Sequence, residues 1–269
     1  MIRVGVLGAT GRMGRLVCQA VADDPDLALA AAVARSHVGE PLGVAIGRPE
    51  LDVVVSDELD TLLQAEVEVA VDFTRPDVVM NHVRWAIDHA VHIVVGTSGV
   101  GPAELAEIER RLEEEGRESN VVVVPNFAIG AVLLQRFAAL AAHHFPSVEI
   151  VELHHEGKLD APSATALATA ERIVRARREA WRGPDAESLQ GVRGGELDGI
   201  RIHSVRLPGL VAHQEVIFGG PGQTLTLRHD SVDRSSFLPG ILLAIKSVVS
   251  RPGLTVGLEP LLGLGDPQL

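Results

Sequence analysis

Two adjacent histidines, a lysine and a Pro-Ser pair lie within one short segment near the middle of the chain, ELHHEGKLDAPSATA (152–166). Imidazole and ammonium groups are the side chains best suited to moving protons and holding carboxylates near neutral pH. His154 and Lys158 are therefore the candidates for proton transfer. Lys158 either protonates a substrate nitrogen, holds a carboxylate or is an ordinary surface charge.

The two histidines are expected to have separate roles. They end a run with strand character, and neighbouring side chains of a strand point to opposite faces, so they cannot easily serve one metal ion or one proton together. A metal site would have to combine them with Glu156 and Asp160, and the sequence offers no other cluster of Cys and His. We predict no metal site.

Ser163 begins a predicted helix. A serine N-cap leaves the first amides of a helix free, here those of Ala164 and Thr165, and free amides at a helix N-terminus bind anions. A substrate carboxylate could dock there without an arginine. The alternative is a plain helix cap, and capping and binding can coexist.

The beginning of the chain, IRVGVLGATGRMG, reads as a strand, a glycine-rich turn and a helix. Gly8, Gly11 and Gly14 would let the backbone turn tightly, admit a pyrophosphate and aim helix amides at it. The position of the turn in the first strand-helix-strand unit predicts dinucleotide binding rather than a structural turn. Arg12 either contacts phosphate or faces solvent.

The cofactor preference depends on the end of the second predicted strand, where an acidic residue would bind the ribose of NADH. That place reads Val33-Ala34-Arg35-Ser36, without a carboxylate. Arg35 could pair with a 2′-phosphate, which favours NADPH over NADH, although an exposed arginine in a polar loop would look the same. Two later strands end at 96–99 and 124–127, and both ends are predicted to lie near the nicotinamide or to be simple turns.

The elements that must position these residues follow from apolar runs and helical patterns. Strands are predicted at 2–7, 27–34, 53–55, 67–73, 92–95 and 121–124, with helices at 15–22, 78–90 and 103–115 between them. Pro76 and Pro102 are expected in first helical turns. Apolar strands that alternate with helices predict a parallel sheet covered on both faces.

The pattern changes after Asn126. Helices are predicted at 130–143, 163–181 and 236–249, and strands at 148–153, 201–207, 213–218 and 224–229, with a turn at Gly219–Gln223. The fold class is therefore α/β, with a Rossmann-like parallel-sheet nucleotide domain and a smaller α+β mixed-sheet domain. We place the first at 1–126, completed by 236–269, and the second at 127–235.

Composition excludes several classes of function. The 269-residue chain has a formal net charge of −12 and a pI near 5.3. No basic field is present to neutralise phosphates, so nucleic acid is not an expected partner. Its apolar runs are too short for a membrane span, and Cys18 is a single cysteine, so a cytoplasmic protein without disulfides is expected. No signal-peptide pattern opens the sequence.

The segment 152–166 closely resembles the E-x-HH-x-x-K-x-DAPSGTA motif of the 4-hydroxy-tetrahydrodipicolinate reductase (dihydrodipicolinate reductase) family of bacterial lysine biosynthesis. Other matching pieces follow in the family's order over essentially the whole chain. They are GATGRMG, DFTRPD (72–77), VGTSG, PNFAIGA (125–131), GVRGG (191–195), AHQEVIFG (212–219) and RHDSVDRSSF (228–237).

This resemblance implies an NAD(P)H-dependent reduction of a cyclic, unsaturated imine dicarboxylate. It assigns proton transfer to His154 and Lys158, and substrate contacts to His155 and to the amides of Ala164 and Thr165 after Ser163. It also implies a homotetramer formed through the second domain. The cofactor-binding positions implied are Gly8, Ala9, Thr10, Gly11, Arg12, Met13, Ala34, Arg35, Gly96, Thr97, Ser98, Val124, Pro125, Asn126 and Phe127.

Two residues depart from the family pattern. Ala164 replaces a glycine, which is mild if the position is an ordinary helical N-terminus and costly if its φ is positive. Glu156 adds a carboxylate that either repels a dicarboxylate or faces water. A related two-domain dehydrogenase with another substrate and a non-catalytic NADPH sensor are the alternative functions.

Overall fold

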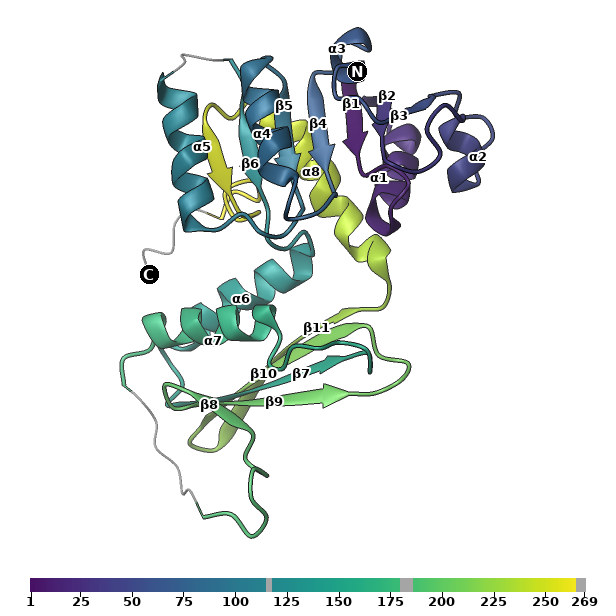
Figure 1. The fold of residues 1–269 in the computed structure, drawn as a ribbon. Helices are drawn as coiled ribbons and strands as arrows, with labels where there is room; N and C mark the ends of the chain where they lie inside the picture. The colour runs from purple at the N-terminus through teal and green to yellow at the C-terminus, as the bar shows by residue number, and fades with distance from the viewer. Residues whose placement is uncertain (115–117, 180–185, 265–269) are drawn as a thin grey trace. The chain divides into compact units, whose positions relative to one another are not determined.

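The computed structural model describes residues 1–114, 118–179 and 186–264 (Figure 1). The chain divides into two compact units, one formed by Met1–Phe127 with residues 237–264 and the other by Ala128–Ser236. We call them the first and the second unit. Among the described residues, no helix is both long enough and apolar enough to cross a membrane.

The first unit is built on a seven-stranded sheet in which every neighbouring pair of strands is parallel. The order β12-β6-β5-β4-β1-β2-β3 reverses its direction between β1 and β4, and ligands bind at such a point in parallel sheets. The strands are β1 (Ile2–Leu7), β2 (Leu27–Val33), β3 (Val55–Ser56), β4 (Val69–Asp72), β5 (His92–Val95), β6 (Val121–Val123) and β12 (Leu254–Val256).

Helices cover both faces of this sheet (Figure 1). In α1 the buried residues Gly14, Val17, Cys18 and Val21 recur at helical spacing and form its core-facing stripe. Helices α1 and α8 pack together, and α4 packs with α5. The helices are α1 (Arg12–Asp23), α2 (Leu42–Ile46), α3 (Thr61–Gln64), α4 (Val79–Asp88), α5 (Pro102–Glu114) and α8 (Leu238–Val248). A 3-10 turn at Arg234–Phe237 spans the chain boundary between the second and the first unit.

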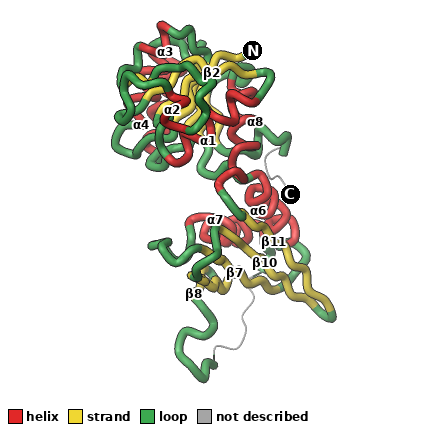
Figure 2. The backbone as a smooth tube through the Cα atoms, turned by 90° about the vertical axis from the view of Figure 1, so that its right-hand side faces the viewer, coloured by secondary structure: helices red, strands yellow, loops and turns green. Residues whose placement is uncertain are grey.

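The second unit is a five-stranded mixed sheet in the order β11-β10-β7-β9-β8, antiparallel except for the pair β7 and β9. Helices α6 (Ile129–Ala141) and α7 (Ala164–Ala176) lie on one face (Figure 2). Their apolar side chains pack on Ile150, Ile202, Val216 and Phe218. The strands are β7 (Ser147–His154), β8 (Gly195–Leu197), β9 (Ile200–Arg206), β10 (Ala212–Gly220) and β11 (Gln223–Ser231).

The predicted fold class is confirmed, whereas several details differ. Pro102 is the first residue of α5, but Pro76 lies in a turn ahead of α4, so its predicted helical position was wrong. Helix α7 ends at Ala176 because Arg177 is extended, and the expected helix end at Trp181 lies outside the described residues. The sequence did not predict α2, α3, β8 and β12, which are too short for a periodic signal.

Candidate active site

The glycine turn of the first unit follows β1. Gly8 has φ +80, and a Cβ on it would lie 2.4 Å from the carbonyl oxygen of Phe73, after β4. A Cβ on Gly14 would lie 2.0 Å from the Gly8 carbonyl oxygen. Only glycine fits these two positions, and no side chain caps the start of α1. The turn therefore offers close backbone approach and uncapped helix amides, which are the features that a pyrophosphate needs.

The next strand ends lie beside this turn. The Asp72 carboxylate is fully buried at the end of β4. Its Oδ1 accepts hydrogen bonds from the Thr74 amide (2.9 Å) and the Thr97 hydroxyl (2.6 Å), and its Oδ2 lies 2.6 Å from Nδ1 of His82. A Cβ on Gly96 would meet the rings of Phe73 and Phe127. The structure thus brings the predicted segments 96–98 and 124–127 to one edge and fixes Thr97 in place.

The end of β2 holds the predicted ribose-side residues. Ala34 is buried and its amide donates to the carbonyl of Ser56 (2.8 Å), whereas Arg35 is exposed. The hydroxyl of Ser36 is 2.8 Å from that of Thr10 in the glycine turn. Arg35 also acts on Asp77, whose pKa is lowered mainly by Arg75 and in part by the Arg35 charge.

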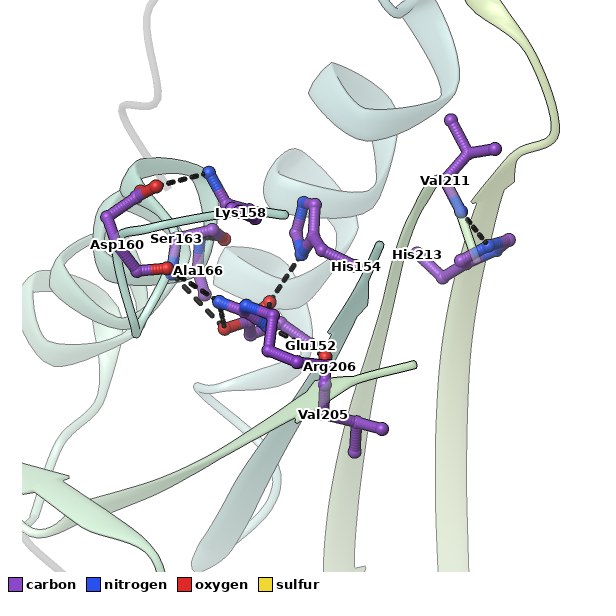
Figure 3. A network of polar contacts seen from close by, with 10 residues as sticks. All are labelled: Glu152, His154, Lys158, Asp160, Ser163, Ala166, Val205, Arg206, Val211 and His213. Atoms are coloured by element: carbon purple, nitrogen blue, oxygen red, sulfur yellow. Dashed lines mark hydrogen bonds and ion pairs between the residues drawn. The ribbon is translucent and has the colours of Figure 1, made fainter. Parts of the chain in front are cut away.

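In the second unit, Glu152 is the centre of the polar network (Figure 3). Its carboxylate is fully buried and accepts two hydrogen bonds from the Arg206 guanidinium, at 2.8 and 3.0 Å. Nδ1 of His154 lies 2.5 Å from Oε2, and the Ser163 amide donates to Oε1 at 3.3 Å. Glu152 and His154 meet because residues two apart on β7 share a face.

The charges of this network determine which ring nitrogen of His154 is available for proton transfer. Burial alone would raise the pKa of Glu152, but hydrogen bonds from Arg206, Ser204 and His154 hold that pKa below its ordinary value. An ionised carboxylate only accepts hydrogen bonds, so Nδ1 of His154 carries the proton and donates. The transferable proton of His154 therefore belongs to Nε2, which has no hydrogen-bond partner in the part of the chain that the structure describes.

The structure gives His154 a depressed pKa. Burial lowers it most, the charges of Lys158 and Arg206 lower it further, and Glu152 opposes them. Without a ligand the imidazole is therefore neutral at pH 7. An anionic ligand beside Nε2 would raise the pKa and favour the protonated form.

Lys158 lies in the turn after β7. Its amide donates to the His155 carbonyl (3.1 Å), and its ammonium is 2.7 Å from Oδ1 of Asp160, whose pKa it lowers. An ammonium has three donors, so further donors are left for a ligand. His155 and Glu156 are exposed, which places Glu156 in water rather than against Glu152.

Helix α7 begins as the sequence predicted. Ser163 is its N-cap, with φ −65 and ψ 150, and its Oγ accepts from the Ala166 amide (3.1 Å). Among the described residues, the amides of Ala164 and Thr165 have no hydrogen-bond acceptor. Ala164 is the first helical residue, where right-handed φ suits any residue, so the exchange of the family's glycine introduces no backbone strain.

The predicted residues of the second unit therefore gather at one end of β7, and those of the first unit at the carboxyl edge of its sheet. No role was predicted for Glu152, Arg206, Asp72 or His82. A signal existed for Glu152, because a glutamate two residues before a strand-end histidine shares its face. No local pattern marks Arg206, which comes from another strand.

No group of three or more His, Cys, Asp or Glu in the described residues could hold a metal ion.

Comparison with known proteins matches both units. The model of the dihydrodipicolinate reductase N-terminus matches residues 2–127, and that of the C-terminus matches residues 130–262. The 4-hydroxy-tetrahydrodipicolinate reductase of Nocardia farcinica is 50% identical over 98% of this chain and 99% of its own. That of Corynebacterium diphtheriae is 48% identical over 96% and 97%.

Solved structures of related proteins support the same family relationship. A dipicolinate-bound dihydrodipicolinate reductase from Paenisporosarcina sp. TG-14 has a TM-score of 0.86 and 41% identity, covering 97% of this chain and 99% of that chain. An amine dehydrogenase from Mycobacterium smegmatis, at 18% identity and TM-score 0.64, covers 94% of both chains and shares the fold alone. The relationship expected from the sequence is confirmed: the chain belongs to the dihydrodipicolinate reductase family.

Proposed function

We propose that this protein reduces 4-hydroxy-tetrahydrodipicolinate to tetrahydrodipicolinate with NAD(P)H and one proton, releasing water and NAD(P)⁺. The observation that carries the proposal is the His154 imidazole, held through Nδ1 by a buried carboxylate, beside Lys158 and the free amides of α7. A proton donor next to an anion-binding surface suits an imine dicarboxylate. The family membership of the whole chain supports the same reaction.

The substrate carboxylates would bind at the start of α7. The amides of Ala164 and Thr165 would hold one carboxylate, and Lys158 and His155 would bind the rest of the dianion. Because the protein's net charge is −12, this local positive surface must overcome a repulsive overall field. The dipicolinate found in the related structure is a dicarboxylate of the same size class.

His154 would serve as the acid in this proposal. The bound dianion would raise the pKa of the imidazole, so that Nε2 is protonated only when substrate is present. That proton would then neutralise the charge that develops on the substrate at carbon or nitrogen. Lys158 would hold a carboxylate or give a proton to the 4-hydroxyl group, which leaves as water.

The first unit would bind the dinucleotide. Bound NAD(P)H supplies the hydride, and the protein supplies position and charge. Residues 8–13 would surround the pyrophosphate, Ala34 and Arg35 the ribose, and residues 96–98 and 124–127 the nicotinamide. The fixed Gly8 and Gly14 backbone fits this assignment. The second unit would bind the substrate and would also provide the contacts of a homotetramer. We expect the protein to be cytoplasmic.

Arg35 tests the preference for NADPH. If its guanidinium pairs with the 2′-phosphate, Arg35→Ala raises the KM for NADPH far more than the KM for NADH. Arg12→Ala is the matched comparison: Arg12 is placed beside the pyrophosphate, which both cofactors carry, so its loss should change the two KM values alike. Equal effects of Arg35→Ala on both cofactors would remove Arg35 from 2′-phosphate recognition.

The reaction is tested by following NADPH and NADH oxidation with purified protein, supplied with the product of a synthase that condenses pyruvate with aspartate semialdehyde. Prompt oxidation that depends on the synthase supports the reductase. NADPH binding without oxidation would favour a non-catalytic NADPH sensor. Oxidation that occurs only with other imines or keto acids would favour a related dehydrogenase.

A further inference from the structure

Glu152 and Arg206 have no part in the chemistry described so far, yet they surround His154. Glu152 is fully buried, and burying an ionised carboxylate is costly unless it is paired and hydrogen-bonded. Its oxygens accept hydrogen bonds from Arg206 twice, from His154, from the Ser163 amide and from the Ser204 side chain. Such a fully paired charge is typical of a group that orients a neighbour.

The Arg206 guanidinium also links the elements around the site. Its Nη2 donates to the carbonyl of Asp160 (2.7 Å), and its Nη1 donates to that of Val205 (2.8 Å). Arg206 therefore connects β9 to the segment that carries Lys158 and leads to Ser163. One guanidinium both holds Glu152 ionised and anchors the loop before α7.

We propose that Glu152, kept ionised by Arg206, is a positioning residue that fixes the His154 ring and its tautomer, so that the transferable proton is carried on Nε2. This inference rests on the proposed function, in which His154 is the acid. A neutral residue at position 152 would leave the ring free to turn and either nitrogen free to carry the proton. A carboxylate that orients a histidine through Nδ1 performs the same role in other acid–base sites.

The pH dependence of turnover gives a readout that a purely structural role would not change. The charged groups that act on His154 are Glu152 on its own strand, Arg206 from β9 and Lys158 from the turn. The β10 residue opposite His154 is Ala212, and α7 begins with uncharged residues. Losing the Glu152 anion lowers the pKa of the imidazole, so the acid form is lost at a lower pH.

The test variant is Glu152→Gln, which is nearly isosteric. We expect kcat to fall at least about tenfold and its high-pH limb to move about one pH unit or more toward acid. The Kd for NADPH should stay unchanged. The matched control is Glu149→Gln, the same exchange on the same strand. Among the described residues, the Glu149 carboxylate pairs with Arg193 and His203 and not with His154. It should keep the wild-type kcat and pH profile.

An unchanged kcat and pH profile in a folded Glu152→Gln enzyme would overturn the proposal. Should that variant not fold, ¹⁵N NMR of histidine-labelled wild-type enzyme, with the His154 signals assigned from His154→Asn, decides the question. Protonated Nδ1 and unprotonated Nε2 at high pH support it, and the opposite tautomer contradicts it. An inactive wild-type enzyme would instead refute the proposed function, while the NMR measurement would still test the role of Glu152.

Discussion

On each face of strand β7, a glutamate of the strand contacts one histidine and one arginine. On the face toward α6 and α7, Glu152 contacts His154 and Arg206, and we call this the inner cluster. On the opposite face, Glu149 contacts His203 and Arg193, the outer cluster. The two glutamates lie three residues apart, so strand alternation separates them.

Burial is the main difference between the clusters. The Glu152 side chain is 0% exposed, whereas that of Glu149 is 32% exposed. Water screens the outer charges, but the inner charges interact in a medium of low dielectric constant. The histidine of the inner cluster also lies next to Lys158 and α7, where an anion could bind. The same three residue types can thus be a surface ion pair or a proton-transfer device, depending on the face.

The largest expected difference between the clusters is catalytic. His154→Ala should lower kcat by about 10²-fold or more, because it removes the acid, and Lys158→Ala should have an effect of similar size. His203→Ala removes the outer histidine and should leave turnover near wild type. Steady-state kinetics measure kcat for these variants, and NADPH titrations check that NADPH binding is intact. Full turnover of His154→Ala would remove the distinction.

The arginines should differ in their effect on stability. Arg206→Met leaves the buried Glu152 charge unpaired and should reduce the free energy of unfolding by about 3–5 kcal/mol. Arg193→Met breaks a partly exposed pair and should cost about 1 kcal/mol or less. Urea unfolding at pH 7 compares the two variants. Equal losses would mean that burial does not separate the clusters energetically.

The inner carboxylate should also make stability depend on pH. The pKa of Glu152 is lower in the folded protein than in the unfolded chain, where it is about 4.3. The unfolded chain therefore binds more protons in the window between the two values, and stability falls as pH drops through it. The difference in unfolding free energy between wild type and Glu152→Gln should shrink below about pH 5. Urea unfolding at several pH values tests this, and a constant difference would contradict it.

The smallest effect concerns salt. Charges on the outer cluster are partly exposed, so the cost of Glu149→Gln should be at most about 1 kcal/mol and should decrease as salt is raised to about 1 M. The cost of Glu152→Gln should change little over the same range. Urea titrations at low and high salt give both values. A strong salt dependence at Glu152 would show that water reaches the inner cluster.

Much of the fold could be predicted because its signals are local. The run Ile2–Leu7 and the run His92–Val95 were placed at their observed ends, since each is an apolar segment between polar turns. Short elements such as β12 were not predicted, because three residues show no periodicity and the strand is stabilised by pairing with β6. The position of Pro76 was wrong because the turn before α4 continues for two residues beyond it.

The reactive groups could be identified from residue types and their spacing: the glycine turn, His154, Lys158 and the Ser163 cap lie within short stretches whose local geometry follows from residue type. The electrostatic environment of these groups depends instead on contacts between distant parts of the chain. Arg206 reaches Glu152 across 54 positions of the chain, and Asp72 meets Thr97 across 25. Sheet pairing makes these contacts, and burial then gives the charges their strength; neither is encoded in any local pattern.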